Sequence, residues 1–151
     1  MPAAKLKEFL DANGVKYVSL VHSQAFTAME VAESAHVKGR EMAKAVVVKL
    51  DGRLALAVLP ATRKVDLEAL RQGTGALQAE LAHEHEFRGD FPGCEVGAMP
   101  PFGNLFGMEV FVDPALAAHD EIAFNAGTHV ELIRMAYADF ARLVKPRVVS
   151  M

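Results

Sequence analysis

The sequence predicts a single α+β domain in which helices pack on a mixed, largely antiparallel sheet. Its 151 residues are 52% hydrophobic and 23% charged, which is the composition of a packed globular chain with one core. Residues 43–50 and 53–59 are rich in aliphatic side chains and flank Asp51-Gly52, a two-residue hairpin signal. The other helix and strand patterns follow one another irregularly, unlike the regular alternation of a doubly wound parallel fold. One domain over residues 1–151 is therefore expected.

The first elements are predicted from apolar spacing and capping signals. Leu6, Phe9 and Leu10 share one face of a helix over residues 3–12, and Asn13-Gly14 is typical of a helix end. A strand over residues 16–22 should follow. Thr27 and Glu30 form a capping-box pattern, which predicts a second helix as far as about residue 35.

The hairpin strands are apolar on both faces, which predicts a central place in the sheet. A short helix at 66–72 and a strand at 77–82 are expected after it. Residues 87–107 are crowded with Gly, Pro and Phe, so they should form a long ordered loop of the kind that often carries function.

The last third of the chain should complete the sheet. A strand is expected at 108–112, and Asp113-Pro114 is a favourable helix start, with Asp as the cap and Pro at the first helical position. Strands at 121–125 and 130–135 and a closing helix at 137–144 are expected after it.

Several classes of protein are disfavoured by the sequence. Its apolar runs are far shorter than the roughly 20 residues of a membrane span, and the N-terminal segment lacks the apolar stretch of a signal peptide. Cys94 is the single cysteine, so no internal disulfide is expected. These features favour a cytoplasmic protein without a membrane partner. The glycine patterns of phosphate and dinucleotide sites and the nucleophile turn Gly-x-Ser-x-Gly are missing, which disfavours covalent catalysis.

Charge is unevenly distributed along the chain, although the net charge is only −3. Residues 38–71 hold eight Lys or Arg against four acidic residues, whereas residues 80–121 hold one Arg against nine acidic residues. The basic stretch could meet a phosphate backbone or simply form a solvated face. Charge alone does not decide between these interpretations.

Lys44 is the first candidate functional residue. Because residues two apart share a strand face, Lys44 lies with Val46, Val48 and Leu50. A two-residue turn pairs Leu50 with Arg53 and sets Lys44 opposite an apolar neighbour, Leu59. A cation in that place either extends to solvent or lines a pocket.

The turn from Gly97 to Pro101 is the second candidate. Its glycine and paired prolines favour a stiff, sharply turned backbone whose N–H groups could face a carbonyl or an oxyanion. An ordinary rigid surface loop is the alternative. His129, in a Gly-Thr-His turn, and His22, at a strand end, could act as a base or bind RNA, or could be structural.

His83, Glu84, His85 and Glu86 superficially suggest a metal site. Residues two apart diverge on a helix and no further ligand cluster lies near in sequence, so no metal site is expected here.

Taken together, these landmarks resemble the YbaK and prolyl-tRNA synthetase editing-domain family, the freestanding trans-editing deacylases. The resemblance covers nearly the whole chain. The matching features are His22 before the Thr27 helix, Lys44 at the start of a Val-rich strand, the segment 63–67, the Gly97-x-x-x-Pro101 loop followed by Phe102-Gly103, and the segment 124–127 at a strand end.

The resemblance implies hydrolysis of the ester that joins an amino acid to the terminal ribose of tRNA, without a cofactor. It implies that Lys44 helps to hold the aminoacyl group and that the backbone of Gly97 and Pro101 is presented to it. Water would be the nucleophile. Further substrate-binding candidates are His22, Thr27, Met29, Val31, Met99, Phe102, Gly103, Gly127, Thr128 and His129.

The expected partner is the acceptor end of an aminoacyl-tRNA, with an aminoacyl-tRNA synthetase as a further candidate and no DNA. Ala45 follows Lys44, where some relatives with alanine specificity carry a polar residue, which argues against an alanine-only enzyme. A small amino acid (Ala, Ser or Thr) is favoured. Two alternatives stay open: a non-catalytic module that binds tRNA or a synthetase, and a hydrolase of small esters or amides.

Overall fold

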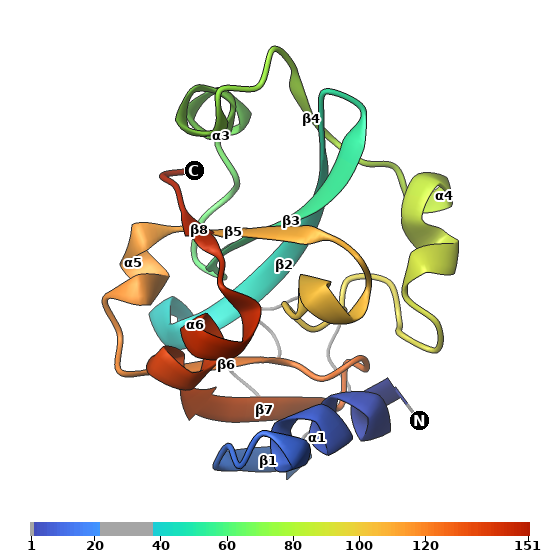
Figure 1. The fold of residues 1–151 in the computed structure, drawn as a ribbon, viewed down its shortest axis with the longest axis vertical. Helices are drawn as coiled ribbons and strands as arrows, with labels where there is room; N and C mark the ends of the chain where they lie inside the picture. Colours follow the sequence, from blue (N-terminus) through green and yellow to red (C-terminus); the bar gives the residue numbers. More distant parts are fainter. Residues whose placement is uncertain (1, 22–37) are drawn as a thin grey trace.

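A computed structural model describes residues 2–21 and 38–151. Figure 1 shows its helices and strands. The helices are α1 (Pro2–Ala12), α3 (Leu67–Thr74), α4 (Glu84–Phe87), α5 (Pro114–Ala117) and α6 (Tyr137–Val144). The strands are β1 (Tyr17–Val21), β2 (Met42–Leu50), β3 (Arg53–Pro60), β4 (Ala79–Leu81), β5 (Glu109–Val112), β6 (Glu121–Asn125), β7 (Glu131–Ala136) and β8 (Arg147–Val148). The helix predicted from Thr27 lies outside the described residues.

The eight described strands form one mixed sheet in the order β1-β7-β6-β2-β3-β5-β8, with β4 on β2. Pairing is antiparallel between β1 and β7, β6 and β7, β2 and β3, and β2 and β4. It is parallel between β2 and β6, β3 and β5, and β5 and β8. The predicted mixed, largely antiparallel sheet is confirmed.

The hairpin β2–β3 is the centre of the sheet, as its two apolar faces predicted. Asp51 and Gly52 have φ values of 51° and 82°, the left-handed pair that a tight primed turn requires. The register pairs Leu50 with Arg53 and Lys44 with Leu59. The count from the turn therefore placed Lys44 correctly.

Each face of the central sheet is buried by different elements. One face packs against α1 and α6 through Leu6, Leu10 and Phe140, and α1 lies along β1 and β7 in Figure 1. The other face, which carries Val48 and Leu59, packs against Leu70 of α3 and the C-terminal residues. At about 25 cal/mol per Å² of buried apolar area, these two cores are the main stabilising contribution to the fold.

Local signals explain where the short helices begin and end. The Asp66 side chain accepts a hydrogen bond from the Ala69 N–H, and Gly75 ends α3 in a left-handed conformation. Asp113 caps α5 in the same way through the Ala115 N–H. No helix in the described part of the chain is long and apolar enough to cross a membrane.

The structure differs from the sequence prediction in four places. The strand expected at 77–82 is limited to Ala79–Leu81, and neither the short helix α4 nor β8 was predicted. Segment 87–107 is broken by two short 3-10 turns, Arg88–Asp90 and Gly103–Leu105. These turns bury Phe87, Phe91 and Phe102 in the core, so this loop is held by its own aromatic side chains.

Candidate active site

The candidate site lies where the sheet opens beside Lys44. The edge of β2 away from β3 pairs with β6 at Met42–Ala43 and with β4 at Val48–Leu50. Among the described strands, none pairs with that edge between these two points. Lys44 therefore lies on the part of β2 whose outer edge pairs with no described strand, and this gap between β6 and β4 is the opening in the sheet.

The surroundings of Lys44 disfavour its charged form. Its side chain is partly buried opposite Leu59, and burial together with the nearby charge of Lys64 lowers the pKa of Lys44 below the usual value for lysine. Among the described residues, none forms an ion pair with Lys44. An unneutralised ammonium in a partly dry site is suited to bind a carbonyl oxygen or a developing oxyanion.

The loop from Gly97 to Pro101 is held against the end of β6. The Gly127 N–H donates to the Ala98 oxygen at 2.9 Å, and the Glu95 N–H donates to the Gly127 oxygen at 2.8 Å. Gly97 (φ 85°) and Gly127 (φ 99°) both have left-handed backbones, which explains glycine at these two positions. The structure thus brings the two predicted glycine turns together.

The N–H groups of this loop are not all available to a ligand. The Ala98 N–H donates to the Glu95 oxygen at 3.0 Å, so it is already used. The Gly97 N–H donates to the Met99 sulfur at 3.3 Å, and a thioether is a weak acceptor that a carbonyl oxygen could replace at low cost. Gly97 is therefore the stronger candidate donor of the two.

His129 is buried beside Gly97 and is oriented by a carboxylate. Its Nδ1 lies 2.6 Å from Oε2 of Glu95, and the residue is 5% exposed. Because an ionised carboxylate can only accept, this contact favours Nδ1 as the donor and leaves Nε2 as the acceptor of the neutral ring. A β-carbon built on Gly97 would lie 3.5 Å from that Nε2, so the histidine faces the loop.

Glu95 was not singled out from the sequence. It lies 34 residues from His129, and no local pattern links the two. The nearest signal was its position two residues before Gly97, inside the loop that had been given a function.

The remaining predicted site residues have varied environments. Met99 and Gly127 are buried at the contact between the two turns, and Thr128 is partly buried with its hydroxyl 3.5 Å from the Val130 N–H. Pro101 is buried in the same loop. His22, Thr27, Met29 and Val31 lie outside the described residues.

Phe102 and Gly103 belong to the protein core. The Phe102 ring is completely buried and contacts the rings of Phe9, Phe124 and Phe140. A β-carbon on Gly103 would approach the Met108 oxygen to 2.6 Å. The two residues therefore anchor the end of the loop in the core. A direct contact of either residue with substrate stays a prediction.

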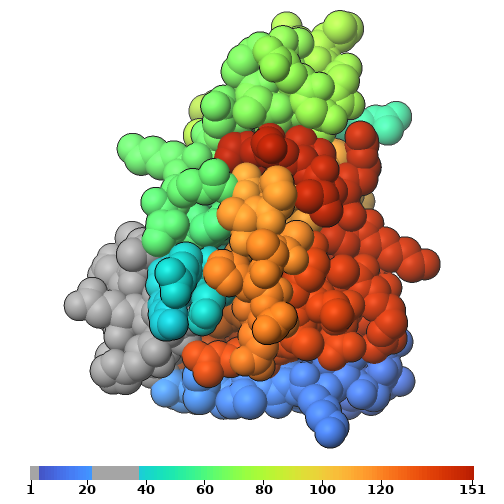
Figure 2. Space-filling model, turned by 90° about the vertical axis from the view of Figure 1, so that its left-hand side faces the viewer, coloured from blue at the N-terminus to red at the C-terminus, as the bar shows by residue number. Residues whose placement is uncertain are grey.

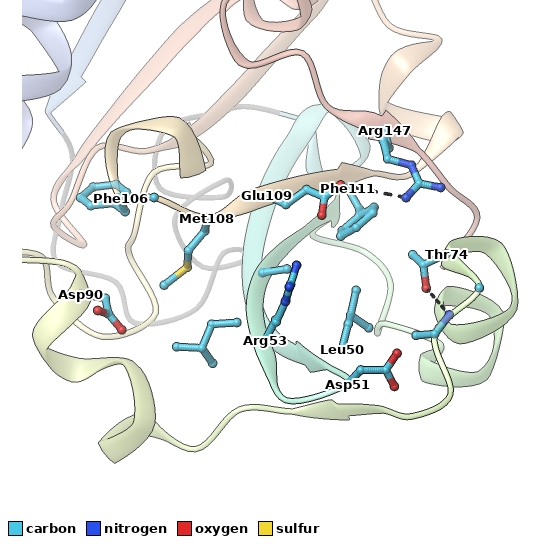
Figure 3. A pocket seen from close by; sticks show the side chains of 15 residues that line it. Leu50, Asp51, Arg53, Thr74, Asp90, Phe106, Met108, Glu109, Phe111 and Arg147 are labelled. Atoms are coloured by element: carbon cyan, nitrogen blue, oxygen red, sulfur yellow. Dashed lines mark hydrogen bonds and ion pairs between the residues drawn. The ribbon is translucent and has the colours of Figure 1, made fainter.

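A cavity of about 960 Å³ lies at the turn end of the hairpin, away from Lys44 (Figure 3). Its fifteen lining residues include Leu50, Asp51, Arg53, Phe111 and Arg147. None of the predicted site residues lines it. Charges of both signs face it, including Asp90 and Glu109. Its size alone does not make it the site of the chemistry that Lys44 and His129 indicate.

The His-Glu-His-Glu segment has a structural use. The Glu86 side chain accepts from the His83 N–H at 3.0 Å and from Lys49 Nζ at 3.0 Å. The rings of His83 and His85 stack with centroids 5.7 Å apart. Within the described residues, no group of three or more His, Cys, Asp or Glu side chains is arranged to hold a metal ion.

Comparison with known proteins assigns this arrangement to a family. Residues 22–143 match the model of the aminoacyl-tRNA editing domain. The chain is 32% identical, over 97% of its length and 90% of the relative, to the multifunctional Ser/Thr-tRNA deacylase ProXp-y of Escherichia coli (strain K12). The same figures hold for the protein of that name from Escherichia coli O157:H7.

Solved structures share the fold. One is described as a proposed trans-editing enzyme for prolyl tRNA synthetase, with a TM-score of 0.82, 22% identity, and coverage of 99% of this chain and 97% of that one. A hypothetical protein has a TM-score of 0.85 at 21% identity, with coverage of 97% and 99%. The chain belongs to the aminoacyl-tRNA editing domain family. The resemblance inferred from the sequence is thereby confirmed.

Proposed function

We propose that this aminoacyl-tRNA deacylase acts in trans on mischarged tRNA and removes a small amino acid, with serine and threonine as first candidates and alanine as the third. The observation that carries the proposal is the partly buried Lys44 at the opening of the sheet, with a lowered pKa and no ion pair to any described residue. The 32% identity to a Ser/Thr-tRNA deacylase supports the substrate class. Fold and family support hydrolysis of the aminoacyl ester.

The proposed reaction is attack of water on the ester carbonyl carbon. The carbonyl oxygen becomes an oxyanion, and collapse of this intermediate breaks the bond to the ribose oxygen, which leaves with a proton. The products are a free amino acid and a tRNA with a free terminal hydroxyl. No covalent enzyme intermediate is needed.

Lys44 would hold the carbonyl oxygen and stabilise the oxyanion, since its ammonium provides fixed positive charge where negative charge develops. Preorganised charge of this kind is worth more in a partly buried site than in water. The Gly97 N–H is the candidate second donor, because its thioether acceptor is readily replaced.

His129 is the candidate base for the attacking water. Its Nδ1 contact with Glu95 fixes the ring so that Nε2 faces Gly97. The neutral tautomer with a proton on Nδ1 has a lone pair on Nε2, which is the form a general base requires. His22, the other histidine predicted for the site, lies outside the described residues.

The acceptor end of tRNA would approach across the face that carries Lys64. In Figure 2 the segment around residues 60–75, in green, lies above the start of β2, in cyan. Arg63 is paired with Asp113, whereas Lys64 forms no ion pair with any described residue and is close enough to affect Lys44. Lys64 is therefore the better candidate for a phosphate of the tRNA end.

The decisive test is a panel of tRNAs charged with serine, threonine, alanine and a large amino acid such as phenylalanine. We expect the wild-type protein to release the three small amino acids faster than the large one. Loss of the ester is followed over time against a reaction without protein. Failure to accelerate release from any tRNA would overturn the proposal and favour a non-catalytic module that binds tRNA or a synthetase.

A synthetase partner is a separate part of the proposal. Addition of this protein to a reaction in which a synthetase mischarges the preferred tRNA should lower the amount of mischarged product at steady state, even without a stable complex. If this protein has to form a complex with the synthetase, it should deacylate purified mischarged tRNA only when that synthetase is present.

A further inference from the structure

Asn125, the last residue of β6, carries a buried amide oxygen that accepts no hydrogen bond from any described residue. The residue is 5% exposed, and no protein group in the described structure donates to its Oδ1. Buried amide groups are nearly always satisfied, because an unpaired one costs about 1–3 kcal/mol. An oxygen left in this state calls for a functional explanation.

The position of Asn125 relates it to Lys44. The parallel register pairs Met42 with Ala123 and Ala43 with Phe124, so Lys44 and Asn125 are the next residues on their strands. Because side chains alternate, both project from the sheet face that carries Met42 and Ala123. Asn125 therefore lies near the base of the Lys44 side chain, at the point where β2 and β6 cease to pair.

The chemistry of the oxygen defines what it can bind. An amide oxygen only accepts hydrogen bonds, so an ester carbonyl, itself an acceptor, cannot be its partner. The donors of an aminoacyl group are its α-ammonium and any side-chain hydroxyl. A second cation is disfavoured here, because Lys44 is already affected by the charge of Lys64 and by burial.

We propose that Asn125 determines specificity by accepting a hydrogen bond from the side-chain hydroxyl of an aminoacyl group bound beside Lys44. This inference rests on the proposed function and adds to it the residue that recognises serine and threonine. A site built to hydrogen-bond a hydroxyl discriminates against the analogue that lacks it, because the buried oxygen is then left unpaired.

The test compares pairs of substrates that differ by one hydroxyl. Threonyl-tRNA is compared with 2-aminobutyryl-tRNA, and seryl-tRNA with alanyl-tRNA, on the wild type and on Asn125→Leu. Leucine has nearly the shape of asparagine and removes the unpaired oxygen, so it should fold at least as well. Asn125→Ala is the second variant, and circular dichroism and thermal unfolding check the fold of both.

We expect the wild type to cleave the hydroxyl-bearing substrate of each pair faster. The Asn125 variants should lose on the order of tenfold of that preference, while cleavage of the substrates without a hydroxyl stays within about twofold of wild type. An unchanged preference would overturn the assignment, and so would an equal loss on both members of a pair, which would indicate a role in binding the ammonium or in structure.

The outcome separates this inference from the proposed function. If the wild type cleaves no aminoacyl ester, the deacylase proposal fails. If the wild type cleaves the esters and the Asn125 variants keep its preference, only the assignment of Asn125 fails.

Discussion

The two lysines of β2 occupy opposite electrostatic environments on one strand. Lys49, near the turn, is paired with Glu86 at 3.0 Å and Glu80 at 3.7 Å, and the hydrogen bond to Glu86 raises its pKa. Lys44, at the other end, has a lowered pKa because burial and Lys64 oppose its charge. Lys49 is paired with carboxylates, whereas Lys44 forms no ion pair with any described residue.

This difference shows why a charge has to be judged by its neighbours and not by its count. The hairpin end with Lys49 faces the broad cavity of Figure 3, where positive and negative side chains mix. At the end with Lys44, the neighbouring charge that affects this lysine is that of Lys64, and no described acidic residue pairs with it. An unbalanced cation is what stabilises an oxyanion, and the two lysines therefore make a matched pair for testing.

The largest expected effect is on catalysis. Replacing Lys44 with Met should lower kcat/KM for seryl- or threonyl-tRNA by about 100-fold or more, the range seen when a donor to an oxyanion is removed. Lys49→Met, which removes an equal charge from the same strand, should stay within about threefold of wild type. Equal losses in the two variants would contradict a special role for Lys44.

The next effect concerns the backbone at Gly97. An alanine there meets only an ordinary contact with His129, at 3.5 Å, but forces an L-residue to keep φ near 85°, at a cost of about 1–2 kcal/mol. We expect Gly97→Ala to lower the deacylation rate roughly tenfold as the turn shifts.

Gly75→Ala is the control for that variant. Gly75 has φ 77° and nothing within 4 Å of its built β-carbon, so it carries a similar backbone cost at the end of α3. Both variants should unfold at lower temperature, and only Gly97→Ala should lose activity. A normal rate for Gly97→Ala would remove the loop from the site.

A smaller effect is expected from the carboxylate that orients His129. Glu95→Gln keeps the shape and removes the charge, so the ring should lose part of its fixed tautomer. We predict a decrease in kcat of about three- to tenfold. Glu84→Gln, at an exposed ion pair with Arg88, should leave kcat unchanged, and a decrease of kcat in both would point to a general charge effect.

The smallest effect is on stability, and it has opposite sign at the two lysines. The folded-state pKa of Lys44 is lowered, so its charged form opposes folding at neutral pH and the opposition fades as pH rises through the lowered pKa. Lys44→Met should therefore unfold at a slightly higher temperature than wild type at pH 7.

Lys49 behaves in the reverse sense. Its folded-state pKa is raised, so its pairing stabilises the fold below the usual lysine pKa and is lost as pH rises through the raised value. Lys49→Met should unfold at a slightly lower temperature at pH 7. If the unfolding temperatures of the two variants shift in the same direction, the two lysines do not differ in their contribution to stability.

Much of the fold could be predicted because its signals are local. Asp51-Gly52 set the hairpin and hence the register at Lys44, and Asp66 and Asp113 marked two helix starts. The two-residue strand β8 was missed because it has no periodic pattern and depends on parallel pairing with β5. Parallel partners are distant in sequence and leave no turn signal.

Candidate site residues could be proposed from the sequence, but their arrangement could not. Lys44, Gly97 and His129 each stood out by type and local context. The opening between β6 and β4 on β2, the Glu95 contact with His129 and the unpaired oxygen of Asn125 are all long-range features. Sequence spacing gives no measure of such contacts, so they required the three-dimensional structure.

The most direct test of the central claim separates chemistry from tRNA binding at Lys44. Single-turnover cleavage of seryl- or threonyl-tRNA is measured with saturating protein for wild type, Lys44→Met and Lys49→Met, and the affinity of each for uncharged tRNA is measured in parallel. We predict a loss of about 100-fold in the cleavage rate of Lys44→Met alone, with tRNA affinity changed by less than about threefold. A normal cleavage rate at saturation, with weakened tRNA binding, would show that Lys44 holds the nucleic acid and does not act on the ester.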